Sequence, residues 1–275
     1  MDRLLVITPH CSGQVPQDVL AQMLGDARDD LEARERLLRR VWLQGDPYTD
    51  VMFDVPGAVA VHATVSRFVV DVNRARDDAG PNGVVKATDF DAAPLYPPGR
   101  EPDPTEVEER LRRYWDTFHA TVERLIEERG FDLILVGHSM SGTGPALGPD
   151  SGARRPAVTL MTGGDEAGEP VPGRRPSVEP ALARELRRLA EEAFAPLLEA
   201  ARGTVDPVVA LNRPWSVDEL SYRHGPPHGV PAFGLEVNRD LYLDESTGRA
   251  LPGRVPALRA ALSAFAAAAL EAVRR

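Results

Sequence analysis

The chain has 275 residues, of which 43% are hydrophobic, and carries a formal net charge of −10 with an isoelectric point near 5.2. This size and apolar content are enough for one large hydrophobic core, and the acidic balance argues against nucleic acids and anionic membrane surfaces as partners. Its single cysteine, Cys11, excludes an intramolecular disulfide and fits a reducing compartment. Because neither a signal-peptide pattern nor a membrane-spanning apolar run is visible, we expect a cytoplasmic location with no membrane contact.

Apolar runs alternate with amphipathic segments, which predicts alternating strands and helices. In chain order, the predicted elements are an apolar strand from residue 4 up to His10, a helix at 31–41, a helical turn at 49–54, a strand at 58–65, an apolar run at 68–74, a loop at 77–104, a helix at 105–129 ended by Gly130, a strand at 133–136, a strand at 157–161, a helix at 180–202, strands at 207–211 and 232–237, and a helix from 256 to the C-terminus. The stretch Thr105-Glu106-Val107-Glu108 is typical of a capping box at the start of its helix. This order predicts a three-layer α/β fold in a single domain spanning residues 1–275.

Two of the predicted strands end in a histidine. The strand at 133–136 continues into His138, the first strand continues into His10, and a serine follows each histidine within two residues. Because the carboxyl ends of parallel strands meet at one edge of a sheet, we expect the two imidazoles to converge there. Neutral imidazole is the commonest metal ligand, and a catalytic zinc takes about three protein ligands and a water. The pattern therefore predicts a metal site that needs a third ligand, a carboxylate.

The same stretch has a second interpretation. Gly137-His138-Ser139-Met140-Ser141 approaches the G-x-S-x-G nucleophile elbow of serine hydrolases, with Ser139 as nucleophile and His224 or His228 as base. The elbow needs a helix directly after the serine, whereas residues 141–152 contain four glycines and two prolines, which disfavour a helix. A serine hydrolase, and a non-catalytic binding protein on the same fold, stay open as alternatives.

Several short motifs follow one another in order over nearly the whole chain. They are Pro9-His10-Cys11-Ser12-Gly13 with Pro16, Thr49-Asp50 with Asp54, Ser66-Arg67-Phe68-Val69-Val70-Asp71-Val72-Asn73-Arg74, Tyr114-Trp115 with His119, His138-Ser139-Met140, Arg223-His224-Gly225, and Leu235-Glu236-Val237-Asn238-Arg239 with Tyr242. In this order, the motifs resemble the N-formylglutamate amidohydrolase (deformylase) family.

The resemblance implies both a fold and an activity. The fold would be of the phosphorylase/hydrolase type, related to zinc carboxypeptidases, with a mixed, largely parallel central sheet. The activity would be hydrolysis of the linear amide of a small acidic N-formyl or N-acyl amino acid, such as N-formylglutamate, by water activated on a metal. The implied cofactor is one zinc ion per chain, or another divalent metal in its place.

The resemblance also assigns roles to individual residues. His10 and His138 would bind the metal, with Asp54 as the carboxylate ligand. Asp50 lies four residues earlier and shares a face with Asp54 on a helical turn, so Asp50 stays open as the alternative ligand. Glu236, a charged residue inside a predicted strand, would be the general base that activates the metal-bound water and passes its proton to the leaving amine.

Arginines provide candidate contacts to an acidic substrate. Arg67 and Arg74 flank the apolar run, and an arginine fork matches a carboxylate through paired hydrogen bonds. The alternative for these two arginines is a structural salt bridge with Asp71 or Asp54.

The segment before the Glu236 strand provides two further candidates. Arg223 is predicted to bind the substrate, and His224 is predicted to contact the transition state. Gly137 stands where the family often has an aspartate, so we expect one contact of the site to be missing.

Overall fold

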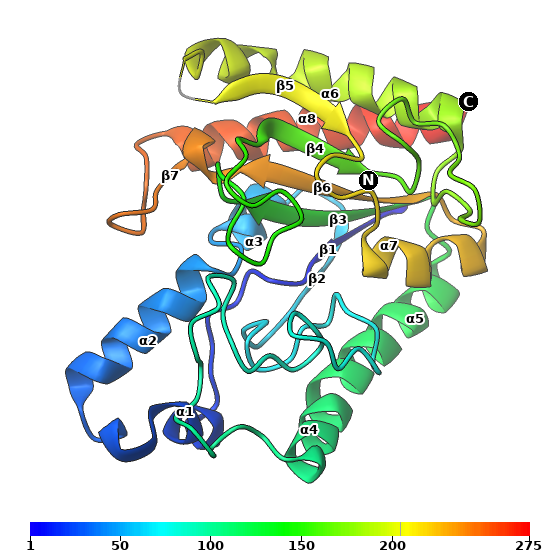
Figure 1. The fold of residues 1–275 in the computed structure, drawn as a ribbon. Coiled ribbons are helices and arrows are strands. Elements are labelled where there is room, and N and C mark those ends of the chain that lie inside the picture. Colours follow the sequence, from blue (N-terminus) through cyan, green and yellow to red (C-terminus); the bar gives the residue numbers. More distant parts are fainter. Residues whose placement is uncertain (204) are drawn as a thin grey trace.

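The structure is a computed structural model that describes residues 1–203 and 205–275. A six-stranded sheet in the order β2-β1-β3-β6-β4-β5 forms its centre (Figure 1). Neighbouring strands are parallel except β4 and β6, which are antiparallel. The predicted mixed, largely parallel sheet is therefore confirmed. The strands are β1 (Leu4–Thr8), β2 (Val59–His62), β3 (Leu133–Met140), β4 (Pro156–Met161), β5 (Asp206–Leu211) and β6 (Ala232–Asn238), with a separate hairpin of β7 (Leu243–Asp244) and β8 (Arg249–Ala250).

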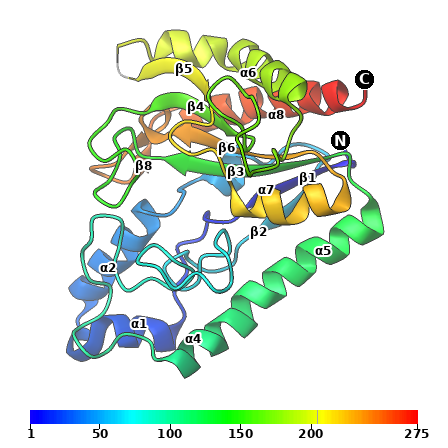
Figure 2. The same cartoon turned by 45° about the vertical axis from the view of Figure 1, so that its right-hand side comes forward.

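Helices cover both faces of this sheet, with α6 and α8 on one face and α5 and α7 on the other (Figure 2). The three-layer architecture is therefore also confirmed. The α-helices are α1 (Gln17–Leu24), α2 (Leu31–Leu43), α3 (Thr49–Met52), α4 (Pro104–Arg110), α5 (Thr117–Arg129), α6 (Pro180–Ala200), α7 (Glu219–His224) and α8 (Arg254–Val273). A π-helical stretch at Leu111–Asp116 joins α4 to α5, and short 3₁₀ turns lie at Gly25–Ala27, Pro226–His228 and Arg239–Leu241.

The alternation of side chains along β1 explains how both faces are filled. Leu4 and Val6 belong to the core beneath α6 and α8, whereas Leu5 and Ile7 belong to the core beneath α5. All four are fully buried, as expected for a strand covered on both sides. The C-terminal helix α8 is long and apolar enough to cross a membrane by length and composition. Its apolar side is nevertheless buried in the core against α6, as Phe265 illustrates.

A further apolar cluster lies beside the sheet, where α1, α2 and the segment between β2 and α4 meet (Figure 1). The apolar run at 68–74 is a loop, and its Phe68, Val69 and Val70 are buried in this cluster. This packing holds the loop close to the carboxyl end of β1, which matters for the site described below.

The helix predicted at 105–129 starts earlier than expected. Asp103 is its N-cap and accepts hydrogen bonds from the backbone of Thr105 and Glu106, while the Glu106 carboxylate accepts one from the Asp103 backbone. The capping box therefore exists, but it begins two residues before the predicted one. Pro104 explains the shift, because proline is well suited to the first helical position.

Gly137 of β3 is explained by its neighbour across the layer. A Cβ placed on Gly137 would lie 2.5 Å from Cγ of Phe53, a fully buried ring. At the position where the resemblance suggested an aspartate, the space is occupied by a phenylalanine.

We expect Gly137→Ala to destabilise the protein by about 1–3 kcal/mol, because a methyl group must be forced into a filled core. Urea unfolding of the variant measures this cost. In a Phe53→Leu background, which removes the ring, the same alanine should cost clearly less. Equal costs in the two backgrounds would show that the contact with Phe53 is not the constraint.

Candidate active site

His10 and His138 lie at the carboxyl ends of neighbouring parallel strands. Ile7 of β1 is paired with Val136 of β3, so the two histidines emerge at the same edge. Both residues are only 2% exposed, and their ring centroids lie 5.1 Å apart. The structure thus brings together the two histidines that the sequence singled out.

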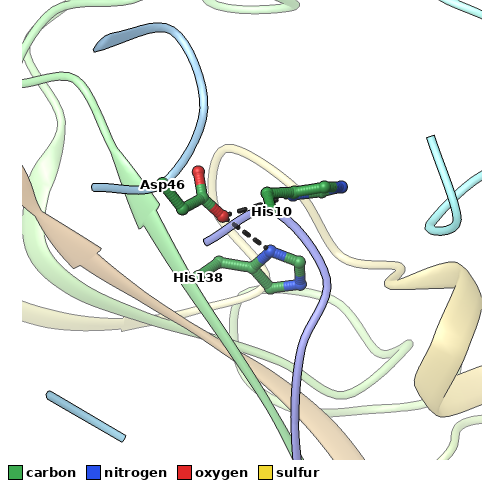
Figure 3. A group of neighbouring side chains, drawn as sticks. All are labelled: His10, Asp46 and His138. Atoms are coloured by element: carbon green, nitrogen blue, oxygen red, sulfur yellow. Dashed lines mark hydrogen bonds and ion pairs between the residues drawn. The ribbon is translucent and has the colours of Figure 1, made fainter. Parts of the chain in front are cut away.

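The carboxylate that faces both rings belongs to Asp46 (Figure 3). Its Oδ2 lies 3.2 Å from Nδ1 of His10 and 3.2 Å from Nδ1 of His138. One ligand atom from each of these residues lies within 4.8 Å of the other two. Because two donors on one tetrahedral zinc, each at about 2.0–2.2 Å from it, lie roughly 3.3 Å apart, this spacing suits a single ion.

Neither Asp54 nor Asp50 lies at this centre, so the structure contradicts both predicted carboxylates, and the one beside the two histidines is Asp46. Asp54 is on the surface, 60% exposed, and pairs with Arg259. Asp50 is exposed on α3. The cause is a contact between distant segments, because the backbone N–H of Asp46 donates to the carbonyl of His10 at 2.9 Å and holds the turn at 43–47 beside the histidine. The sequence signalled Asp46 only as part of a Gly-Asp-Pro turn.

The turn that carries Asp46 is held from the other side as well. Arg239 donates to the carbonyl of Gly45 at 2.6 Å and to that of Leu43 at 2.7 Å. The Tyr242 hydroxyl donates to the carbonyl of the residue after Asp46 at 2.9 Å. These bonds fix a short loop that would otherwise be free to move the carboxylate.

The opposite nitrogen of each imidazole meets a further carboxylate. Nε2 of His10 lies 2.8 Å from Oδ1 of Asp71, and Nε2 of His138 lies 3.1 Å from Oδ1 of Asp218. Metal-binding histidines commonly donate this second N–H to a carboxylate, which fixes the tautomer and the orientation of the ring. Neither aspartate is among the site residues predicted from the sequence. The available signal for Asp218 was its position just before α7, where it is the N-cap.

Asp71 is fully buried and surrounded by cations. Arg67 donates to its Oδ2 at 2.8 Å and Lys86 donates to the same oxygen at 2.7 Å. Burial disfavours the charged carboxylate, but Arg67, Lys86 and His10 outweigh this effect and hold the pKa of Asp71 well below its usual range. Asp71 is therefore a fixed negative charge behind His10.

Glu236 lies on β6 directly beside His138, its partner in the parallel register. Its Oε2 is buried and has no hydrogen-bond partner among the described residues. Burial raises the pKa of Glu236 to about 7. A carboxyl group with such a pKa can accept and return a proton near neutral pH, as a general base requires.

A cavity of about 470 Å³ opens over the two histidines and Glu236. Four arginines border it: Arg67, Arg74, Arg155 and Arg239. Arg67 is engaged with Asp71, which was one of the two predicted alternatives. Arg74 donates to the backbone carbonyls of Asn73 at 2.9 Å and Asn82 at 3.0 Å. Within the part of the chain that the structure describes, no carboxylate pairs with Arg74, so its charge is available to an anion.

Arg223 and His224 lie away from the cavity, against their predicted contact with the substrate. Arg223 pairs with Glu219 one turn earlier on α7. His224 is buried, with Nε2 at 2.8 Å from Nδ1 of His119, and burial lowers its pKa to about 4. The reason is the direction of α7, whose first turn reaches the site through Asp218 while its last turn packs on α5.

The geometry does not provide a nucleophile elbow. β3 continues past Ser139 to Met140, and the segment that follows contains no helix before α6. Oγ of Ser139 accepts a hydrogen bond from Arg239 at 3.4 Å. Of the two proposed bases, His224 is engaged with His119, and His228 is exposed. The described residues therefore lack the serine–histidine pair that this alternative requires.

Comparison with known proteins identifies the family. The family model for N-formylglutamate amidohydrolase matches residues 2–243 of the chain. The chain belongs to the N-formylglutamate amidohydrolase family.

Relatives within this family cover part of the chain. The N-formylglutamate deformylase of Pseudomonas aeruginosa is 31% identical over 199 residues, which are 69% of this chain and 66% of that protein. The N-formylglutamate deformylase of Pseudomonas putida is 35% identical over 100 residues, which are 33% of this chain and 38% of that protein. The chain therefore aligns with less than two thirds of the length of either relative.

Solved structures share the fold. An N-formylglutamate amidohydrolase from Ralstonia eutropha superimposes with a TM-score of 0.69 at 24% identity, covering 99% of this chain and 94% of that one. A gene product of Agrobacterium tumefaciens gives a TM-score of 0.67 at 18% identity, covering 100% and 92%.

For this member of the N-formylglutamate amidohydrolase family, we expect Arg239→Met to lower the free energy of unfolding by about 1.5–3 kcal/mol, because two backbone carbonyls of the Asp46 turn, one of them buried, lose a charged donor. Chemical denaturation measures the loss. Arg249→Met, at an exposed arginine, should change stability by less than about 0.5 kcal/mol. Similar losses in both variants would mean that the hydrogen bonds from Arg239 to the turn contribute no specific stability.

Proposed function

We propose that this protein is a metal-dependent amidohydrolase that cleaves the amide of a small acidic N-formyl or N-acyl amino acid. The observation that carries this proposal is the meeting of His10, His138 and Asp46 beside a cavity that both histidines line. Glu236 lines the same cavity, and its buried Oε2 has no hydrogen-bond partner among the described residues. Membership in the N-formylglutamate amidohydrolase family supports amide hydrolysis. The names of the two Pseudomonas relatives support a substrate of the N-formylglutamate class.

Zinc suits the residues present. Two imidazole nitrogens and one carboxylate oxygen form the three-donor set found at catalytic zinc sites. The carboxylates of Asp71 and Asp218 would hold the imidazoles in the required tautomer. When bound, such an ion supplies Lewis-acid chemistry at the amide carbonyl and makes water more acidic near neutral pH.

Glu236 would move the protons of the reaction. Its carboxylate takes a proton from the attacking water, whose oxygen forms the new bond to the acyl carbon. As the C–N bond breaks, the same carboxyl group gives that proton to the leaving amine nitrogen. The products are formate, or another carboxylate, and the free amino acid. The pKa near 7 that burial gives Glu236 suits both transfers.

Arg74 and Arg67 would bind the acidic part of the substrate. Arg74 faces the cavity without a carboxylate partner among the described residues, and Arg67 borders the same cavity from the Asp71 side. A guanidinium that already holds a fixed orientation loses little freedom when it binds a substrate carboxylate.

We expect protein purified without chelators to contain about one zinc ion per chain by elemental analysis. Asp46→Ala should lose most of the metal, because it removes the oxygen shared by the two histidines. The matched control is Asp54→Ala, which should keep the metal, since Asp54 pairs with Arg259 on the surface. The reverse pattern would restore Asp54 as the ligand and refute the assignment of Asp46.

We expect Glu236→Gln to reduce kcat for N-formylglutamate by about 10²–10⁴-fold, because the amide keeps the shape of the side chain but cannot accept a proton. Metal content and KM should change little. Ser139→Ala, one residue from His138, serves as the control and should retain most of the turnover. Near-normal turnover in Glu236→Gln would exclude it as the base, whereas loss of metal would make it a ligand. If metal-loaded wild-type protein hydrolyses no N-formyl or N-acyl amino acid, the proposed activity is wrong.

A further inference from the structure

The two sides of the cavity differ in chemistry. Across the sheet edge, His10 follows β1, His138 lies on β3 and Glu236 on β6, with β4 next in order. The cationic residues Arg67 and Arg74 come from the loop beside β1, where Arg67 shares Asp71 with His10. The residues that border the cavity on the β4 side are mainly apolar.

Met161 is one of the apolar residues on the β4 side of the cavity. It lies at the end of β4 and is paired with Gly234 of β6, two residues before Glu236 and on the same face of that strand. The Met161 side chain borders the cavity and covers Gly234, where an added Cβ would lie 2.4 Å from its methyl carbon. The floor of the cavity on this side is therefore apolar.

The segment 213–217 forms a wall of the cavity beside Met161. The Thr159 hydroxyl donates to the carbonyl of Arg213 at 2.7 Å. The backbone N–H of Gly163 donates to the carbonyl of Ser216 at 2.7 Å. These bonds hold the segment along β4, where Trp215 and Val217 border the cavity. Val217 is 39% exposed, and an exposed apolar side chain on a concave site is one that an apolar ligand can cover.

The arginine on this side carries a compensated charge. Arg155 makes two hydrogen bonds to the Asp150 carboxylate, both of 2.7 Å, and is only 3% exposed. Its guanidinium lies 4.4 Å from the centre of the Trp215 ring and supports that ring from one side. The β4 side therefore offers hydrophobic surface and no free cation among the described residues that border it.

We infer that the acyl group of the substrate is an apolar chain larger than formyl and that it lies along Met161, Trp215 and Val217. This inference rests on the proposed function, because it assumes amide hydrolysis in this cavity. An N-acyl amino acid carries its carboxylates on the amine half, which Arg67 and Arg74 would bind. With the amide carbon over His138 and Glu236, the acyl half extends toward β4.

The reaction on such a substrate is an ordinary hydrolysis. The water oxygen bonds to the acyl carbon, the C–N bond breaks, and the amine nitrogen takes the proton that Glu236 removed. The products are an aliphatic carboxylic acid and an acidic amino acid, and no oxidant or further reactant is needed.

The test compares N-formyl-, N-acetyl-, N-butanoyl- and N-hexanoyl-L-glutamate on the metal-loaded protein. We expect kcat/KM to rise with chain length, by about tenfold or more between formyl and hexanoyl, because added methylenes are buried against the apolar side. Trp215→Ala and Val217→Ser should each reduce the hexanoyl-to-formyl ratio by about tenfold or more. The matched control Val51→Ser, at an exposed valine of α3 outside the cavity, should leave the ratio unchanged.

Three other outcomes would contradict the inference. If N-formylglutamate is the best substrate and chain length only lowers kcat/KM, the inference is wrong and the proposed function stands. If N-formyl-leucine or N-formyl-phenylalanine exceeds all acylglutamates and depends on Trp215, the apolar side binds an amino-acid side chain and the inference is again wrong. If no compound of either series is hydrolysed, the inference and the proposed function both fail.

Discussion

The site depends on the contact of one carboxylate oxygen of Asp46 with two buried imidazoles, those of His10 and His138. Each imidazole is held from behind by another buried carboxylate, Asp71 for His10 and Asp218 for His138. Buried carboxylates are costly unless cations or hydrogen bonds compensate them. The cations beside Asp71 compensate that carboxylate, whereas the space between the two rings and Asp46 is where a further cation would balance the remaining negative charge. The start of α7, the loop at 66–74 and the turn at 43–47 each hold one of these aspartates in place.

The sheet determines what surrounds this centre. Parallel pairing of β1, β3 and β6 places their carboxyl ends, and with them the reacting groups, at one edge. The reversed direction of β4 brings the residues before that strand, including Arg155, to the same edge. The segment after β5 then lies along β4 and presents Trp215 to the cavity. One antiparallel pair in the sheet thus separates a charged side of the cavity from an apolar one.

Much of the architecture was predictable because it depends on local pattern. Fully apolar runs of four to eight residues mark strands buried on both faces, and this pattern predicts the strands that lead into His10 and His138. Glu236 stood out because a charge inside a buried strand needs a partner or a chemical role. The capping box before α4 was placed two residues late, since both Asp103 and Thr105 are good N-cap residues and Pro104 between them decided the start.

The carboxylates of the site depended on contacts between segments far apart in the chain. Asp46 and Asp54 are both acidic residues near a short helix, and nothing in their neighbourhood distinguishes them. The difference comes from the backbone bond to His10 and from the clamp by Arg239, which lies 194 residues after Gly45 in sequence. Local periodicity therefore predicts which residues form strands and where those strands end. Which loop side chains meet at those ends is decided only when the tertiary structure satisfies buried charges and backbone groups from several segments at once.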